Sequence, residues 1–493
     1  MRRILLLLFL CVGFVLPARA HVGSKDVFEQ VQAGPYKLYV TVRPPDVIPG
    51  VAVVEVRISG DAVPHSLRVT PVPMTGDASK HPPTPDTLKV SGADAKFFTG
   101  SVWLMAPGSW KVSLLAEGHA GSGSASVPVP AVALQMLRMN RSIGIVLGIL
   151  GFLLVVGVAA IVAAAARESR LVPGQEPSAN SNRRAWLAGS ATLAIALIAV
   201  WLGAKWWNVE AADYAEGVYH PLSLTPTLQG DNLDLAIGAD AANDPHWRRR
   251  NTDLVPDHDH LMHLYAIREP GMDAVFHLHP APAGNGELKM ALPAMPAGRY
   301  RLFADIVHRS GLPETLTSTL DIPADLHGGA LAREDASAAP APISAGELGP
   351  QFHLPDDYTM VWDKPASLRS GKAATFRFHL VDANGKPAAD VVPYLGMAGH
   401  AAFVRDDFST FAHTHPEGSA PMQSMEIANG ESDMAMQNMD SMAGMSGMHM
   451  PETHIDPIVE FPYGFPKPGR YRIFVQMKHG NTVETGVFDA DVQ

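Results

Sequence analysis

Two stretches of the carboxyl-terminal half carry the same histidine pattern. Each has a single histidine seven positions after a proline, then an H-x-H-P element, a Gly-Arg-Tyr-Arg run and a last histidine ten positions after that glycine. The proline is Pro256 in the first copy and Pro393 in the second. The repeated histidines are His263, His277, His279 and His308 in the first copy, and His400, His413, His415 and His479 in the second. A repeat with the same ligand type at the same places predicts two copies of one histidine site.

The H-x-H pair of each copy has the spacing of two ligands on one strand. Side chains two residues apart on a strand point to the same face, so the paired imidazoles can grip one metal ion. His308 and His479 continue the apolar faces of the strands that begin at Gly-Arg-Tyr-Arg, which places them inward, where an unpaired imidazole is costly. Imidazole is a ligand for copper, zinc, nickel and iron. The alternative is that these histidines bond to the backbone or lie on surface loops.

The offset between the copies indicates which metal is bound. The same 137 residues that separate Pro256 from Pro393 set His260 opposite Met397. His and Met are interchangeable ligands for copper and poor alternatives for zinc or calcium. Further ligands or supporting groups in the first copy alone are Asp257, His258 and Asp259. The presence of His260 in one copy and Met397 at the same place in the other favours copper.

The second copy contains a methionine-rich insertion at residues 420–450. The members that we regard as ligands are Met436, Met439, Met442, Met445, Met448, His449 and Met450. The alternatives are a methionine-rich helix face and a disordered low-complexity loop. Asn, Ser, Gly and Asp fill the gaps, with hardly any Leu, Ile or Val, so the segment is not a core helix. Thioethers are soft ligands suited to Cu(I) or Ag(I). The insertion resembles the Met-motif loops of periplasmic copper-resistance proteins, which implies Cu(I) binding.

The amino terminus has the pattern of a secretory signal peptide, residues 1–20, with a basic start, an apolar run and an A-x-A site. The single cysteine, Cys11, lies inside the apolar run. After cleavage the chain is expected to have no disulfide, thiolate site, c-type haem attachment or blue-copper site. The expected first residue, His21, could chelate copper through its amine and imidazole, and here it resembles copper-carrying sandwiches of the CopC type. The alternative is an accidental histidine on a frayed end.

The fold class is predicted as mainly β, with three immunoglobulin-like or cupredoxin-like β-sandwich domains and two transmembrane helices. Residues 21–132 alternate apolar and polar positions between turn signals, as an antiparallel sandwich does. This part resembles the YtkA-like, immunoglobulin-type domains of bacterial envelope proteins. The two histidine repeats occupy residues 208–330 and 351–493, and residues 331–350 read as an Ala/Pro linker.

Two apolar runs, residues 143–166 and 186–203, have the length and composition of membrane spans. Four arginines in the loop at 167–184 place that loop in the cytoplasm, so both large regions are expected to be periplasmic at a bacterial inner membrane. Neither run holds an ionisable residue. Because a transport pathway needs polar groups inside the bilayer, the spans are expected to serve as an anchor.

The composition excludes several classes of function. A formal charge of −11 argues against nucleic acid as a partner. With 47% hydrophobic and 18% charged residues, the chain is of the folded kind. The sequence has no nucleophile elbow, phosphate loop or HExxH pattern, which leaves catalysis without a metal unsupported.

Over residues 250–493 the order of single His, H-x-H-P and Gly-Arg-Tyr-Arg resembles a class of bacterial periplasmic domains associated with heavy-metal handling. The resemblance implies an envelope setting and metal binding. We therefore expect a membrane-anchored copper-binding protein, with Cu(I) or Cu(II) bound and zinc as the alternative, and the sequence leaves open whether it is also an enzyme. Its expected partners are metal ions, the inner membrane and copper efflux or delivery proteins. The rival hypotheses are a copper oxidoreductase, a zinc hydrolase with Asp257 or Asp259 as base, and an envelope scaffold with structural histidines.

Overall fold

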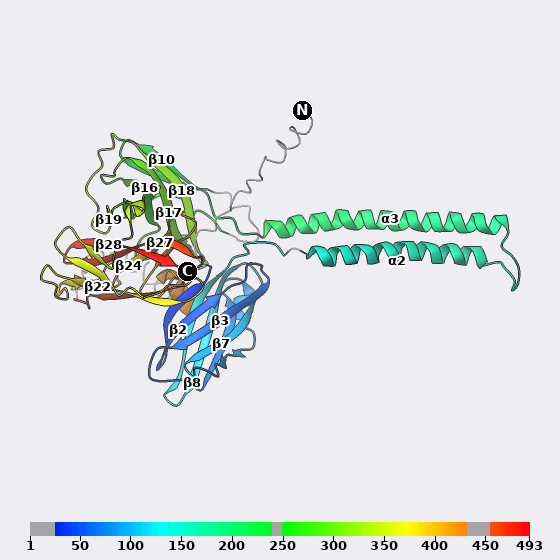
Figure 1. The fold of residues 1–493 in the computed structure, drawn as a ribbon, viewed down its shortest axis with the longest axis horizontal. Helices are drawn as coiled ribbons and strands as arrows, with labels where there is room; N and C mark the ends of the chain where they lie inside the picture. The colour runs from blue at the N-terminus through cyan, green and yellow to red at the C-terminus, as the bar shows by residue number, and fades with distance from the viewer. Residues whose placement is uncertain (1–24, 138, 239–248, 431–453) are drawn as a thin grey trace. The chain divides into compact units, whose positions relative to one another are not determined.

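The computed structural model describes residues 25–137, 139–238, 249–430 and 454–493 (Figure 1). The expected fold class is confirmed, because the chain is mainly β, with sandwich-like domains and two apolar helices. It divides into two compact units. One unit combines Met1–Val132 with His220–Gln493, and the other is Ala133–Tyr219.

The first strands of the larger unit form two antiparallel sheets, as the alternating pattern predicts. In sheet order, the first contains β1 (Val27–Ala33), β2 (Tyr36–Arg43), β3 (Gly50–Ile58), β7 (Phe97–Leu104) and β6 (Lys89–Val90). The second contains β5 (Asp86–Thr87), β4 (Ser66–Pro73), β8 (Gly108–Gly118) and β9 (Gly121–Ala131), and a 3₁₀ turn spans Asp77–Lys80. Alternate residues of these strands are buried, which is the signature of a sheet with one face in the core.

The smaller unit contains two long helices that lie side by side, α2 (Arg141–Glu168) and α3 (Ala179–Glu216) (Figure 1). The side chains of Asn140 and Ser178 cap their amino-terminal ends by accepting hydrogen bonds from backbone N–H groups. Both helices are long and apolar enough to cross a membrane, and both expected spans lie within them.

Each histidine repeat is built from a small and a large sheet. In the first repeat the small sheet contains β10 (Leu224–Gln229), β11 (Asn232–Ile237), β16 (Glu287–Ala291) and β15 (Ala281–Gly284). The large sheet contains β12 (Leu254–Val255), β17 (Gly298–His308), β13 (His263–Arg268), β14 (Val275–Leu278) and β19 (Ala336–Ala338), with β18 (Pro313–Ile322) paired to β17. All of these pairs are antiparallel.

The second repeat is also built from a small and a large sheet, in which the strand order differs at the edges. Its small sheet contains β20 (Gln351–His353), β21 (Thr359–Trp362), β22 (Ala374–Val381) and β26 (Ile458–Tyr463). Its large sheet contains β23 (Val391–Val392), β27 (Gly469–His479), β24 (His400–Arg405) and β25 (Phe411–Thr414), with β28 (Thr482–Val492) paired to β27. A short helix, α4 (Met422–Asn429), follows β25, and a 3₁₀ turn spans Ile343–Ala345 before β20.

Three apolar cores explain how the repeats are joined. One core fills each sandwich, and the third contains outward-facing residues from the two large sheets. On β13, Leu264 and Ala266 lie in the core of their own sandwich, whereas Tyr265 and Ile267 lie in the shared core. Because side chains alternate along a strand, both faces of β13 are buried. The two large sheets therefore pack face to face, and the outward-facing histidines lie between the repeats.

The stretch expected to be a linker is part of the fold. Residues 336–338 form β19, which pairs with β14, the strand that carries His277. Glu334 and Asp335 directly precede β19 and lie beside the histidines. The Ala/Pro stretch therefore positions supporting carboxylates as well as connecting the repeats.

The amino-terminal sandwich holds the segment that follows the second H-x-H pair. The Gln30 amide donates to the Glu417 carbonyl at 2.6 Å, and the Ser419 amide donates to the Phe28 carbonyl at 2.9 Å. The buried carboxyl group of Glu29 accepts from the Ala420 amide at 2.6 Å. The first sandwich thus fixes the backbone near the histidine cluster.

Candidate metal centre

Eight histidines from both repeats gather where the two large sheets meet. They are His258, His260, His263, His277, His279, His400, His413 and His415. The ring of His263 has its centroid 5.3 Å from that of His413 and 6.3 Å from that of His400, so the two copies adjoin. Seven of the eight were predicted as ligands from the repeat pattern. That pattern did not predict that both copies would form one cluster.

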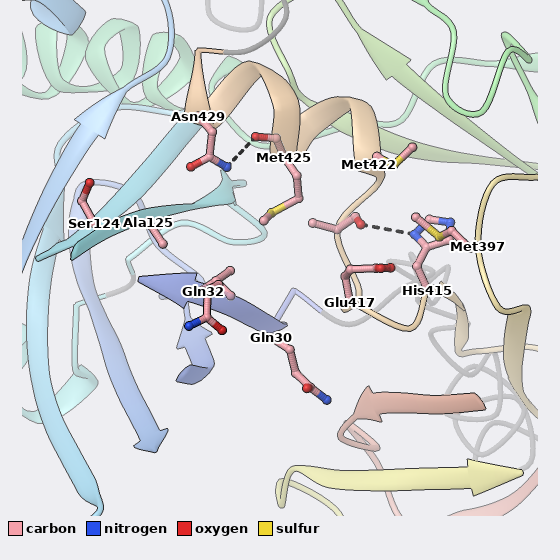
Figure 2. A pocket seen from close by; sticks show the side chains of 12 residues that line it. Gln30, Gln32, Ser124, Ala125, Met397, His415, Glu417, Met422, Met425 and Asn429 are labelled. Carbon is pink, nitrogen blue, oxygen red and sulfur yellow. Dashed lines mark hydrogen bonds between the residues drawn. The ribbon is translucent and has the colours of Figure 1, made fainter. Parts of the chain in front are cut away.

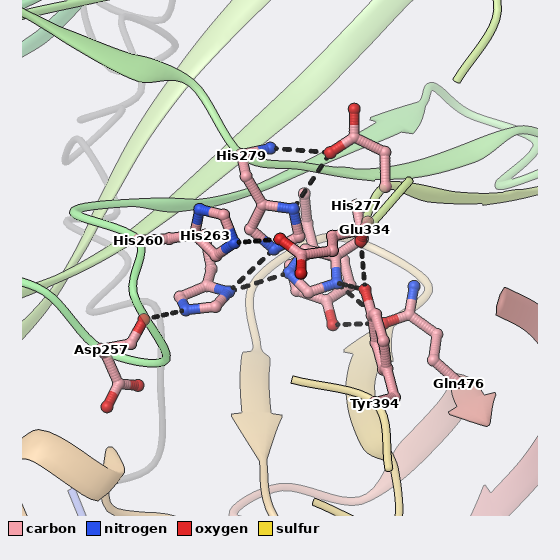
Figure 3. A network of polar contacts seen from close by, with 10 residues as sticks. Asp257, His260, His263, His277, His279, Glu334, Tyr394 and Gln476 are labelled. Carbon is pink, nitrogen blue, oxygen red and sulfur yellow. Dashed lines mark hydrogen bonds and ion pairs between the residues drawn. The ribbon is translucent and has the colours of Figure 1, made fainter. Parts of the chain in front are cut away.

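Three histidines of the first repeat point one ring nitrogen each toward a common centre (Figure 3). The Nδ1 atom of His263 lies 3.2 Å from Nε2 of His277 and 3.2 Å from Nε2 of His279. Two nitrogens bound to one tetrahedral metal ion at a metal–nitrogen distance of about 2.0 Å would lie about 3.3 Å apart. The spacing of this set, the first triad, is therefore that of ligands around one ion.

The outer nitrogen of each ring in the first triad faces an oxygen acceptor. The contacts are His263 Nε2 to the Asp257 carbonyl at 3.1 Å, His277 Nδ1 to Gln476 Oε1 at 2.8 Å, and His279 Nδ1 to Asp335 Oδ1 at 3.0 Å. Because these oxygens accept, each ring carries its proton on the outer nitrogen and a lone pair on the inner one. Three lone pairs at this spacing repel one another unless a cation lies between them.

Protonation does not provide that cation. Burial, together with neighbouring imidazoles, holds the pKa of His263 and of His277 well below the usual value. The same causes lower the pKa of His279 to about 3. The first triad is therefore neutral at physiological pH, and its lone pairs are free for a metal ion.

A second set contains the ring nitrogens of His258, His400 and His415, which lie within 4.8 Å of one another. His413 adjoins it, with its ring centroid 4.8 Å from that of His415. Among the residues that the structure describes, both ring nitrogens of His258 and His400 and the Nε2 atoms of His413 and His415 are buried without a hydrogen-bond partner. Burial lowers the pKa of His415 to about 4. Unpaired buried nitrogens are costly, which points to an occupant here too.

His258 belongs to the second set although it comes from the first repeat. It lies in a tight turn where Asp257 pairs with His260, and it has a left-handed backbone with φ of 51°. The equivalent turn of the second repeat pairs Tyr394 with Met397. The sequence marked His258 as an extra candidate for the first copy, and the repeat contains no signal that assigns it to the other.

His308 is not part of the first triad, although the repeat pattern grouped it with those three histidines. It ends β17 on the face that fills its own sandwich, whereas the first triad lies on the opposite face. Its Nδ1 lies 2.6 Å from Asp253 Oδ1, and its Nε2 lies 2.9 Å from Glu314 Oε2. Arg249 in turn pairs with Glu314 at 2.5 Å. Both nitrogens are engaged, so grouping His308 with the triad was wrong.

His479 is likewise separate from the second set. Its Nε2 lies 2.6 Å from Asp356 Oδ2 and its Nδ1 lies 3.3 Å from Asp390 Oδ2. With Asp356 and Glu484 it forms a group that could hold a metal ion, but through carboxylates. Carboxylate oxygens are hard ligands, and they prefer other metal ions than three imidazoles do.

The remaining predicted ligands have mixed outcomes. His260 stacks on His279 with ring centroids 4.1 Å apart, and its Nε2 lies 3.0 Å from Glu334 Oε2. Met397 lines a cavity with His415 (Figure 2). Outside the described residues lie the signal peptide, His21, Met436, Met439, Met442, Met445, Met448, His449 and Met450.

Comparison with known proteins adds one family match. A family model described as Domain of unknown function (DUF8832) matches residues 226–323 and 353–493, the two histidine repeats. None of the curated proteins matches the chain.

Solved structures offer only distant likenesses. The native conformation of the E. coli alpha-2-macroglobulin matches 95% of this chain and 25% of its own, at 11% identity and a TM-score of 0.15. The D00-D0 domain of intimin matches 54% of this chain and 98% of its own, at 11% identity and a TM-score of 0.13. Dimeric latent PorU from Porphyromonas gingivalis matches 95% and 34%, at 7% identity and a TM-score of 0.14. The chain spans about a quarter of the length of the first of these.

Proposed function

We propose that this chain is a membrane-anchored copper-binding protein that captures and handles copper in the bacterial periplasm. The observation that carries the proposal is the first triad, in which His263 Nδ1 lies 3.2 Å from the inner nitrogens of His277 and His279 and the outer nitrogens are held by acceptors. The second set supports a further ion between the same sheets.

The charge of the ligand set favours a monovalent ion. All three ligands of the first triad are neutral, and His263 and His277 are buried. Moving an ion into a buried site costs desolvation free energy that rises steeply with its charge. Cu(I) therefore suits the site better than a divalent ion does, and imidazole is among its accepted ligands.

A zinc hydrolase has less support. Such a site needs a carboxylate base next to the metal-bound water. The side chain of Asp257 instead accepts a hydrogen bond from the Gln423 amide at 2.8 Å, so it holds α4 in place. Its backbone carbonyl meanwhile orients His263.

Location in the membrane rests on two features. The helices α2 and α3 are each apolar enough to span a bilayer, and the arginines between them favour a cytoplasmic loop. With the signal peptide pattern at residues 1–20, this orientation puts the histidine repeats in the periplasm.

The test is metal binding by the purified full-length chain. Competition against chelators would give the affinities for Cu(I), Cu(II) and Zn(II), in the wild type and in His277→Ala. We expect tight Cu(I) binding in the wild type and the loss of one equivalent in the variant. His353→Ala is the matched control, because His353 is exposed and bonded to Thr359. Zinc bound as tightly as copper, or no stoichiometric metal, would overturn the proposal.

A further inference from the structure

A cavity of about 360 Å³ adjoins the second set of histidines. Three methionines line it, Met397, Met422 and Met425, together with His415. The rest of its wall comes from β1, β9, the segment that leads into α4, and Asn429 at the end of α4. In the part of the chain that the structure describes, this places three thioethers around one space.

The local fold holds two of these thioethers on one helix face. Pro421 precedes α4, and Gly430 ends it in a left-handed conformation with φ of 78°. Met422 and Met425 are three residues apart, so their side chains share a face of the helix. The Asn429 side chain accepts from the Ser126 amide at 3.0 Å, which ties α4 to β9. Figure 2 shows the Met425 side chain projecting from α4 into the space above β1.

His415 connects this cavity to the histidine cluster. It lines the cavity and also belongs to the set with His258 and His400. Its Nδ1 donates to the Ala420 carbonyl at 3.3 Å, while its Nε2 is buried without a partner among the described residues. An ion held by the thioethers would therefore meet an available lone pair at the edge of the cluster.

We propose that this cavity is an entry site for Cu(I), where Met397, Met422 and Met425 take up the ion and His415 passes it to the histidine set. The proposal rests on the proposed copper-binding function. Thioethers are neutral, soft ligands that select Cu(I) or Ag(I) over hard divalent ions. Transfer is an exchange of ligands, in which a copper–imidazole bond replaces a copper–thioether bond without a change in oxidation state. The lining has one carboxylate, from Glu417, which is too few for a calcium site.

The first test uses Ag(I), which binds like Cu(I) and does not change oxidation state in air. The full-length chain would be labelled with ¹³C at the methionine methyl groups and titrated with Ag(I). We expect the methyl signals of Met397, Met422 and Met425 to shift together. Met105, exposed in the amino-terminal sandwich, should be unaffected. Unmoved signals from the three cavity methionines would overturn the proposal.

The second test measures how fast copper reaches the histidines. The Met422→Leu/Met425→Leu double variant keeps the side-chain volume and should fold, because such swaps cost little stability. We expect it to load the histidines several-fold more slowly from a Cu(I)–chelator complex, to the same final occupancy. Met105→Leu is the control and should load at the wild-type rate. Equal rates in all three proteins would overturn the entry site. A wild type that never loads its histidines would instead overturn the proposed function. The methyl shifts would still show whether the three cavity methionines bind the ion.

Discussion

Asp305 on β17 and Gln476 on β27 are equivalent residues of the two repeats, and each lies against the first H-x-H histidine of the opposite repeat. Gln476 Oε1 is 2.8 Å from His277 Nδ1. Asp305 Oδ2 is 3.3 Å from His413 Nδ1. Each repeat therefore supplies a group that orients a histidine of the other, and the second set also takes His258 from the first repeat.

Replacing Gln476 by Leu should weaken metal binding at the first triad. Without the amide oxygen, the Nδ1 proton of His277 loses its main acceptor, so the ring is free to turn or to change tautomer. Loss of such a supporting group typically lowers metal affinity by about 10- to 100-fold. Chelator competition on the full-length chain would measure the change.

Asp305→Asn is the matched variant for the other repeat. It should weaken the second set, which His413 adjoins, and leave the first triad near its wild-type affinity. Equal losses at both sets in each variant would show that the Gln476 amide and the Asp305 carboxyl group act only through the stability of the interface.

His308→Gln should lower stability without changing copper content. Burial alone would lower the pKa of His308, but its bonds to Asp253 and Glu314 outweigh burial and raise it. The ring of His308 is thus paired with a carboxyl group on both sides, and removing one partner of a buried pair costs about 3 to 5 kcal/mol. Denaturant unfolding would report the loss. Unchanged stability with one copper equivalent missing would contradict this interpretation and return His308 to the ligands.

The repeated spacing allowed much of this arrangement to be predicted. It located both strands that begin at Gly-Arg-Tyr-Arg, and the apolar face with Tyr300 and Leu302 does fill the sandwich core. It also placed His277 and His279 close together, with ring centroids 4.5 Å apart. These features follow from local alternation along a strand, which a single sequence contains.

The meeting of the two copies could not be predicted in the same way, because it depends on contacts between distant strands. One signal was present in β13 and β24, where nearly every residue is apolar or His. Such strands are covered on both faces. This pattern is enough to predict that His263 and His400 face a second layer. The contribution of His258 depends on a left-handed turn that no periodicity reveals.

Glu29→Gln should change how stability depends on pH. Burial raises the pKa of Glu29 well above its usual value, so the folded chain keeps this carboxyl protonated where the unfolded chain does not. The stability from that proton is complete below about pH 4.5, the ordinary value for Glu, and is lost as the pH rises through the folded pKa. The loss approaches about 1.4 kcal/mol per pH unit. The variant lacks this slope, so it should gain on the wild type as the pH rises.

Unfolding of both proteins from pH 4 to pH 9 would test this prediction. Glu287→Gln is the control, because Glu287 is exposed on β16. Parallel curves for the wild type and Glu29→Gln would show that the buried carboxyl does not titrate in this range.

Removing copper should lower the free energy of unfolding of the chain, because it leaves the lone pairs of the first triad facing one another. In the first triad His263 Nδ1 faces the inner nitrogens of His277 and His279 at 3.2 Å each, and no proton separates the lone pairs. At a free copper concentration 1,000 times the Kd, binding adds about 4 kcal/mol to the free energy of unfolding. Thermal unfolding with and without a Cu(I) chelator should therefore show a clear drop in Tm for the wild type. His279→Leu removes one of the facing lone pairs, so its stripped form should lose less Tm relative to its copper-treated form. A drop in Tm as large as that of the wild type would place the stabilising copper outside the first triad.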